Sequence, residues 1–573
     1  MSSFFGGDES SGSTKGTAKK GVSVEDGRRR RDEKTLVVRK EKKEESLKKR
    51  RQLTISDAGD ASDAAAATQG SQQTSTNLAT MGTSSDGAQR TFVLSDTPEM
   101  MRMMKNTDTN AQVAALRGFR RLLSVERDPP VQHCIDCGAV PMFVDFLQRN
   151  DSVQLQFEAA WALTNIASTD RTRVLVECRA IPYLAQLLNS ANPEVREQSA
   201  WCLGNVAGDG AELRDVVLSS NAMPYLLANV QQPANLALLR NCTWALSNFC
   251  RGKPAPSLAI VQTALPVLAH LLTQCSDEDT VVDATWALSY ISDGNNDRIQ
   301  AVVDTGVVTT LVAMLHSGKV NAITPALRTL GNIVSGNDEH TQAVVHANVL
   351  SAMVPLLSHA KKNIRKEACW MLSNIAAGTI DQIQGVIAQP GLVASVLEQL
   401  GASSEWDVRK EAAWVVSNIA TAAQVTPVMV ASIVGAGAIQ PLCDLLVASD
   451  VRVVMIALDA LENILKVMTT DGASFGFNVL EMMDEAGGIN KLEDLQEHDD
   501  TKIYERAVKL IETYFTEEGA SEGASENLAP QVAGNGNTFA FGLSSQSNVS
   551  GKNFDFASIS QGPVPTFQSG FQF

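Results

Sequence analysis

The chain has 573 residues and a net charge of −16, and aromatic residues make up 5% of it. That length exceeds one ordinary hydrophobic core, and so few aromatic residues disfavour a β-sandwich or barrel. The charge is uneven: residues 28–51 hold 13 Lys/Arg against 5 Asp/Glu, a local +8 that leaves −24 for the remainder. A basic arm on an acidic body predicts self-association or a basic partner.

Cysteine usage and hydropathy indicate the compartment. The nine cysteines are scattered, and the first ten residues are polar rather than a secretory signal. No apolar run reaches the 18–20 residues of a membrane span. We therefore expect a soluble protein with free thiols and no membrane partner. The CIDC motif at 134–137 lacks a second cysteine pair, so we expect neither a metal site nor a cofactor.

The N-terminal part divides into three segments. Residues 1–20 are rich in Ser and Gly, which predicts disorder. Residues 21–55 form a basic arm, whose middle can be helical through i,i+4 pairs such as Glu44 with Lys48. Residues 56–110 are rich in Ser, Ala and Thr, which is typical of a flexible linker that leads into the folded part. Taken alone, the arm could also be a solvated basic run, a nuclear-localisation signal or a nucleic-acid patch.

A repeat of about 42 residues runs from 111 to 516. Its first motif is a tryptophan followed four residues later by an asparagine. The tryptophans are Trp161, Trp201, Trp244, Trp286, Trp370 and Trp414; the asparagines are Asn165, Asn205, Asn248, Asn332, Asn374, Asn418 and Asn463; Arg328 and Tyr290 fill the gaps. A second motif places Pro141, Pro182, Pro224 and Pro266 where another helix begins, because proline fits the first helical turn.

This period predicts the fold. Apolar residues at helical spacing in units of about 42 residues are typical of armadillo and HEAT arrays. We predict an all-α, right-handed armadillo-repeat superhelical solenoid of about ten repeats over residues 111–516. Each repeat should hold two long helices and a short one. The first and last repeats lack the Trp–Asn pair, as capping repeats often do. The N-terminal flank and the tail over 517–573 should be disordered.

The tryptophans and asparagines predict a binding function. Trp161 and Asn165 share one helical face, and stacked repeats align such pairs into two rows along a groove. Asparagine can both donate to and accept from a peptide backbone. Parallel indoles can hold the stems and cations of Lys or Arg. The ligand implied is an extended basic peptide, with Asp209 as a counter-charge. The KKRR cluster at 48–51 could itself fold back into the groove and inhibit binding.

The arm and the repeats together resemble the importin-α family of nuclear import adaptors. The segment RRRR…LVVRKEKKEESLKKRR is similar to that family's importin-β-binding segment, and the Trp–Asn rows are similar to its cargo groove. The resemblance implies a non-enzymatic adaptor that shuttles between cytoplasm and nucleus. The partners that it implies are cargo with basic localisation signals, importin-β, and an export receptor of the cellular apoptosis susceptibility type. It also implies that RanGTP releases the cargo.

The resemblance also assigns residues to two peptide sites and to the arm. The major site would use Trp161, Asn165, Thr172, Trp201, Asn205, Asp209, Trp244 and Asn248. The minor site would use Asp283, Tyr290, Arg328, Asn332, Trp370, Ser373, Asn374, Glu411, Trp414 and Asn418. Arg328 would repel a ligand lysine and could pair with an acidic group or carbonyl of a cargo linker. The importin-β-binding and autoinhibitory cations would be Arg28, Arg29, Arg30, Arg31, Arg39, Lys40, Lys48, Lys49, Arg50 and Arg51.

Other functions are less consistent with the sequence. An armadillo scaffold for adhesion or signalling would not need the Trp–Asn rows together with the basic arm. An enzyme regulated by an armadillo array has no catalytic motif to support it. Direct nucleic-acid binding by residues 28–51 would show a steep salt dependence. Spaced phenylalanines in the tail resemble those of nucleoporin tails, which suggests nucleoporins as further partners, although only Phe541–Gly542 is a true FG pair there.

Overall fold

The structure is a computed structural model that describes residues 92–125, 128–422 and 426–515, together with the backbone of 531–532 and 539–540. The chain divides into two compact units, Met1–Tyr514 and Phe515–Phe573. The predicted basic arm, most of the linker and the predicted disorder of both flanks lie outside the described residues. Every described helix belongs to the first unit.

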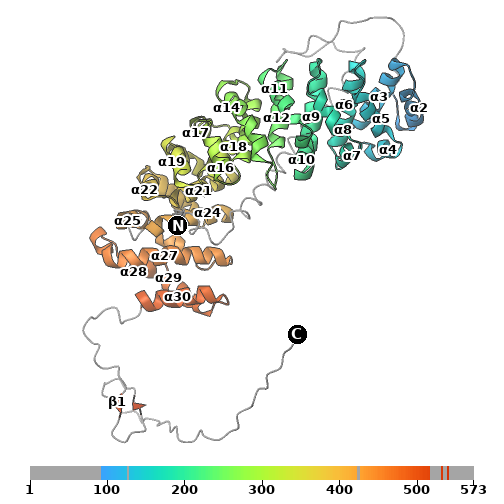
Figure 1. Ribbon diagram of the computed structural model, residues 1–573. Helices are drawn as coiled ribbons and strands as arrows, with labels where there is room; N and C mark the ends of the chain where they lie inside the picture. The colour runs from blue at the N-terminus through green and yellow to red at the C-terminus, as the bar shows by residue number, and fades with distance from the viewer. Residues whose placement is uncertain (1–91, 126–127, 423–425, 516–530, 533–538, 541–573) are drawn as a thin grey trace, which may run out of the picture. The chain divides into compact units, whose positions relative to one another are not determined.

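Long helices recur through the first unit, and each packs against the next long helix along the chain. Figure 1 shows these helices following one another in chain order. Their bounds are α3 (Thr109–Leu123), α6 (Val153–Ala167), α9 (Pro193–Asp209), α12 (Leu236–Phe249), α15 (Glu278–Ile291), α18 (Val320–Ile333), α21 (Lys362–Ala376), α24 (Trp406–Thr421), α27 (Val451–Asp471) and α30 (Thr501–Tyr514).

Two shorter helices precede each long helix from α6 onward. The first of each pair is α4 (Val131–Asp136), α7 (Arg173–Glu177), α10 (Ala211–Ser219), α13 (Leu258–Val261), α16 (Asn296–Val303), α19 (Asp338–His346), α22 (Ile380–Ala388), α25 (Pro427–Gly435) or α28 (Val479–Glu485). The second is α5 (Ala139–Leu147), α8 (Ala180–Leu187), α11 (Ala222–Gln231), α14 (Leu265–Gln274), α17 (Val308–Leu315), α20 (Leu350–Leu357), α23 (Leu392–Leu400), α26 (Ile439–Cys443) or α29 (Gly488–Asp494). Short 3₁₀ turns are η2 (Leu94–Asp96), η3 (Gln262–Ala264), η5 (Gly472–Phe475) and η6 (Leu495–Glu497).

A unit therefore has one long helix and two shorter ones, and the expectation of two long helices was wrong. Residues with positive φ separate the first helix from the second, as at Gly138, Arg179 and Asn221. A left-handed residue at this place ends a helix, so the first one stays short. The prolines lie in the first turn of the second helix as predicted, for example Pro141 in α5.

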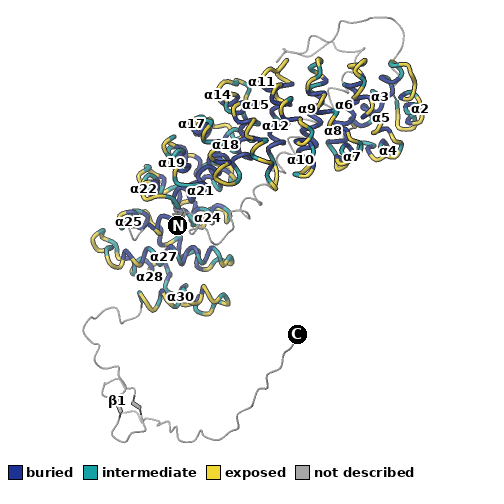
Figure 2. Tube along the Cα trace, in the orientation of Figure 1, coloured by how far each residue is buried: buried dark blue, intermediate teal, exposed yellow. Residues whose placement is uncertain are grey.

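Burial is concentrated on the long helices, as Figure 2 shows. In α9, 11 of 17 residues are buried, and they include polar side chains such as Gln198 and Asn205. This helix is covered by a long helix of the repeat on either side, α6 and α12, and by shorter ones, so little of it reaches water. The core is thus one continuous layer, as expected for stacked repeats that cannot bury their apolar faces alone.

The lead-in to the first repeat, which the sequence placed at the end of the predicted linker segment 56–110, is helical. Helix α2 (Thr97–Met104) packs against α3 and buries Met100 and Met104. A methyl group placed at Gly118 would lie 2.6 Å from the sulfur of Met100 and 2.8 Å from the ring of Phe92. The glycine therefore lets this segment close the exposed end of the array.

In the tail, the described backbone forms an antiparallel pair of two-residue strands, β1 (Gln531–Val532) and β2 (Phe539–Ala540). The all-α prediction thus has this small departure outside the array. Among the described residues, no single helix combines the length and apolarity needed to cross a bilayer, and only the bent pair α16–α17 meets those two criteria when taken together.

Candidate functional site

The predicted tryptophans and asparagines all lie on the long helices, and we call the surface that carries them the ladder face. Six of its asparagines are buried, with exposed fractions between 0% for Asn205 and 6% for Asn374, and Asn463 is half-buried. Trp201 and Trp370 are buried, whereas the other four indoles are half-buried. The side chains of both rows are therefore more buried than those of a surface whose only role is to contact a ligand.

The asparagine amides join successive repeats. Five of them donate Nδ2–H to the carbonyl of the residue just before the ladder position of the preceding repeat. The bonds run from Asn165 to Arg120 (3.3 Å), Asn205 to Thr164 (3.3 Å), Asn248 to Gly204 (3.0 Å), Asn332 to Ser289 (2.9 Å) and Asn418 to Ser373 (2.8 Å). The asparagine row thus stabilises the stack, a role that comes in addition to the predicted contact with a peptide backbone.

Two of the ladder carboxamides, those of Asn205 and Asn374, keep a polar atom for a ligand. An amide group has a second N–H and two lone pairs on its oxygen. The Oδ1 atom of Asn205 is buried and accepts no hydrogen bond among the described residues. The same holds for the Nδ2 atom of Asn374, which donates to no carbonyl of the preceding repeat in this part of the chain. Because an unmade buried hydrogen bond is costly, these two atoms are suited to an incoming peptide.

Small residues underlie the indoles. A methyl group placed at Gly204 would lie 2.4 Å from Cζ3 of Trp244, and one placed at Gly331 would lie 2.2 Å from Cζ3 of Trp370. Both glycines come directly before a ladder asparagine, so each indole rests on the backbone of the preceding repeat. Carbon atoms normally approach to about 3.5–4.0 Å, so neither ring could keep its position over a β-carbon.

The two breaks in the ladder have defined partners. The ring of Tyr290 stacks on Trp286 with centroids 6.0 Å apart and planes at 23°. The guanidinium of Arg328 forms a salt bridge with Glu367 at 3.0 Å, and both side chains are largely buried. An acid from the next repeat therefore offsets the charge of Arg328, whereas the sequence predicted an acidic group or carbonyl of a cargo linker as its partner.

The remaining predicted residues differ in access. Asp209 is exposed at the end of α9, where its carboxylate can meet a ligand cation. Glu411 and Asp283 are half-buried on the long helices. Thr172 and Ser373 are fully buried, and their hydroxyls donate to Thr169 O at 2.9 Å and to Trp370 O at 2.8 Å. These two hydroxyls order their own loop and helix rather than face a ligand. The ten predicted arm cations lie outside the described residues.

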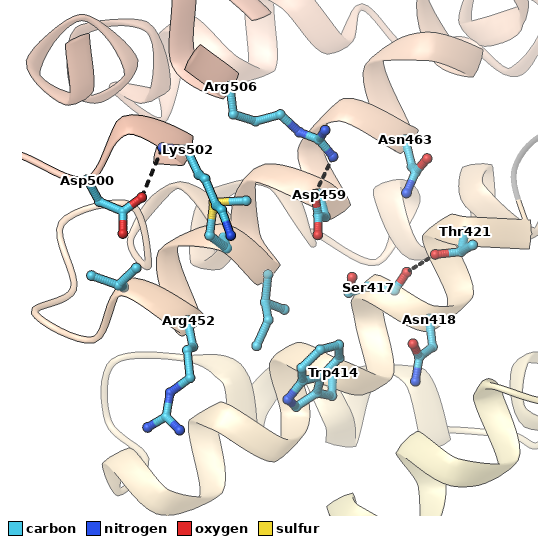
Figure 3. A pocket seen from close by; sticks show the side chains of 13 residues that line it. Trp414, Ser417, Asn418, Thr421, Arg452, Asp459, Asn463, Asp500, Lys502 and Arg506 are labelled. Atoms are coloured by element: carbon cyan, nitrogen blue, oxygen red, sulfur yellow. Dashed lines mark hydrogen bonds and ion pairs between the residues drawn. The ribbon is translucent and has the colours of Figure 1, made fainter. Parts of the chain in front are cut away.

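A cavity of about 560 Å³ lies beyond the last predicted ladder pair, between α24, α27 and α30. Figure 3 shows Trp414 and Asn418 on one side and Arg506 on the other. Asp459 stands four residues before Asn463, where other repeats have tryptophan, and it pairs with Arg506. Burial raises the pKa of Asp459, and Arg506 partly offsets this shift. The ladder thus ends in an ion pair that the sequence pattern did not predict.

The described residues hold no group of three or more His, Cys, Asp or Glu side chains placed to bind a metal ion. The CIDC cysteines are free, and burial raises the pKa of Cys134 to about 12. A thiol with this pKa is a poor nucleophile near neutral pH. The motif belongs to α4 and its C-terminal cap, so its chemistry agrees with a structural role.

Comparison with known proteins identifies the family. Residues 18–117 match the model of the importin beta binding domain, and five stretches between 127 and 466 match the armadillo/beta-catenin-like repeat. Residues 478–531 match the atypical Arm repeat, and 153–206 match a HEAT-like repeat. The first of these ranges contains the basic arm, α2 and most of α3.

Full-length relatives agree with these matches. Importin subunit alpha-1b of Oryza sativa subsp. japonica is 44% identical over 464 residues, which cover 80% of this chain and 85% of that protein. Importin subunit alpha-2 of Arabidopsis thaliana is 46% identical over 432 residues, or 74% of this chain and 80% of that protein. The crystal structure of an engineered protein aligns with a TM-score of 0.66 at 29% identity, over 73% of this chain and 98% of its own. The array is therefore an armadillo-repeat solenoid, and the chain belongs to the importin-α family.

Proposed function

We propose that this protein is a nuclear import adaptor that binds extended, Lys/Arg-rich localisation signals along the ladder face. The observation that carries the proposal is the row of indoles and carboxamides in register on successive long helices. The half-buried indoles give flat faces for lysine and arginine stems. Buried amide atoms such as Asn205 Oδ1 await a backbone partner. Asp209 supplies a carboxylate at the rim of the major site.

The proposal assigns two peptide sites. The major site lies on α6, α9 and α12 around Trp161, Trp201 and Trp244. The minor site lies on α21 and α24 around Trp370 and Trp414, with Glu411 as its acid. Tyr290 and the Arg328–Glu367 pair separate them, so a bipartite signal would place its two basic clusters on either side.

The basic arm supplies regulation in this proposal. The match to an importin beta binding domain over 18–117 supports importin-β as the partner of the arm. The KKRR cluster has the chemistry of the ligand and is tethered to the array, so its effective concentration at the major site is high. Importin-β would withdraw the arm and free the site for cargo. An export receptor of the cellular apoptosis susceptibility type would return the adaptor to the cytoplasm, and nucleoporins would be further partners of the tail.

Fluorescence anisotropy with a labelled lysine-rich localisation peptide tests this function. We expect the full-length chain to bind weakly. A full-length arm variant should bind more tightly because its internal competitor is removed. That variant carries Lys48→Ala, Lys49→Ala, Arg50→Ala and Arg51→Ala. Adding Trp244→Ala to it should abolish most of the binding.

Trp406→Ala is the matched control, because Trp406 is exposed at the start of α24 and lies outside the ladder. It should leave the affinity unchanged. If the arm variant does not bind the peptide at all, the adaptor function is wrong and an armadillo scaffold replaces it. If binding is equal with and without the arm cluster, the peptide site stands and autoinhibition does not.

A further inference from the structure

The inter-repeat bonds define which residues of α3 occupy the ladder positions. Every ladder asparagine that donates to the preceding repeat contacts the carbonyl one residue before that repeat's ladder position. Asn165 donates to Arg120 O, so Arg121 stands in the asparagine position of the first repeat. Arg117, four residues earlier, therefore stands in the tryptophan position. The first repeat carries arginine where the next four carry indoles.

Arg117 pairs with a glutamate at the same repeat position as the partner of Arg328, the other arginine of this row. Its Nε lies 2.9 Å from Oε1 of Glu158, which is three residues before Trp161. Arg328 pairs with Glu367, which is three residues before Trp370. Each run of indoles thus begins just after an arginine that pairs with the acid of the next repeat. Among the described residues, Glu411 occupies the equivalent place before Trp414 without an ion pair, and its preceding ladder residue is Trp370.

The environment of Glu158 is that of a filled cation subsite. Its side chain is 4% exposed and contacts Arg117 through one oxygen and Arg120 Nε through the other at 2.6 Å. The guanidinium carbon of Arg120 lies 4.0 Å from the centroid of the Trp161 ring. The acid and one indole face that would attract a ligand cation are therefore occupied by the chain's own arginines.

We propose that Arg117 occupies in cis the cation subsite next to Trp161 and thereby ends the major site at its first repeat. This inference rests on the proposed peptide-binding function and adds its boundary. The side chain of Arg117 is 25% exposed, so its removal would open the subsite to solvent, while Glu158 would keep Arg120 as a partner. A ligand lysine or arginine beyond Trp161 could then take the place of Arg117 on Oε1.

The test measures peptide length dependence in the full-length variant that lacks the four KKRR cations. A core peptide that spans the major site is compared with two peptides extended by two lysines, one at each end. In the parent, we expect neither extension to change Kd by more than about twofold, as for exposed charges. With Arg117→Ala, the extension at one end should tighten binding roughly fivefold to tenfold, as for a charge-assisted hydrogen bond. Arg117→Gln should behave alike, and thermal unfolding checks that both variants are folded.

Two controls make the result specific. Arg149→Ala removes an arginine of similar exposure that lies outside the ladder and pairs with Asp151 at 2.6 Å. This variant should bind the extended peptides no more tightly than the parent does. Arg117→Ala combined with Glu158→Gln should lose the gain, because the carboxylate is then absent. The inference is overturned if the parent already gains from an extension, or if folded Arg117→Ala binds the core peptide and gains from neither. If the parent does not bind the core peptide, the proposed function fails instead.

Discussion

Replacement of Gly331 by alanine tests the packing between successive repeats. A β-carbon at this position would lie 2.2 Å from Cζ3 and 2.8 Å from Cε3 of Trp370. Ordinary carbon contacts are about 3.5–4.0 Å, so the indole or the helix must move by more than about 1 Å. Trp370 is only 4% exposed, so the ring has little room to move. Such overpacking costs about 1–3 kcal/mol, of which better helix propensity recovers about 1 kcal/mol. We expect Gly331→Ala to lower the free energy of unfolding by up to about 2 kcal/mol.

The assay is urea unfolding of the full-length chain followed by circular dichroism, with a matched glycine as the control. Gly385 lies inside α22, and a methyl group there meets only Leu350 Cδ1 at 3.4 Å. Gly385→Ala should be neutral or stabilise by up to about 1 kcal/mol. Gly204→Ala should cost less than Gly331→Ala, because Trp244 is half-buried and can move outward. A Gly331→Ala protein that unfolds at or above the parent midpoint, while Gly385→Ala behaves as expected, would refute this reasoning.

Three further predictions concern hydrogen bonds, pH and thiols. Asn418→Ala should lower the free energy of unfolding by about 1–2 kcal/mol without any ligand, because it removes the 2.8 Å bond to Ser373 O. Asn374→Ala should cost clearly less, because its amide nitrogen makes no such bond among the described residues. Equal urea midpoints for the two variants would contradict this. Burial raises the pKa of Asp450, but hydrogen bonds from Lys410 and Arg452 outweigh it and bring the pKa to about 2. Because this pKa is below that of the unfolded state, the stabilisation is present above about pH 4 and is lost as pH falls towards 2. With solvent screening, Asp450→Asn should lower the free energy of unfolding by about 1 kcal/mol at pH 7 and leave it unchanged near pH 2. A difference between variant and parent that does not depend on pH would refute the assignment. Burial raises the pKa of the Cys202 thiol to about 12, whereas Cys275 is half-buried. Mass spectrometry after alkylation of the native protein at pH 8 should therefore find Cys275 labelled long before Cys202. Equal labelling rates would contradict the described packing.

The sequence alone determined the repeat and most of the candidate ladder. A period of 42 residues is visible because each unit must bury its apolar face against copies of itself. The Trp–x3–Asn spacing placed both residues on one helical face without any knowledge of the stack. The basic arm and the ladder together were sufficient to indicate the family, which the comparisons confirm.

Only the tertiary structure decided which of these side chains hold the stack together. The asparagine amides bond to carbonyls 41 to 45 residues away, and no local pattern reveals such a partner. The pairing of Arg328 with Glu367 and of Arg117 with Glu158 likewise joins neighbouring repeats. Arg117 could have been found from its distance to Trp161, but α3 lacks the Trp–Asn pair that makes the register visible. Long-range packing, and not helical periodicity, therefore determined where the ladder begins and ends.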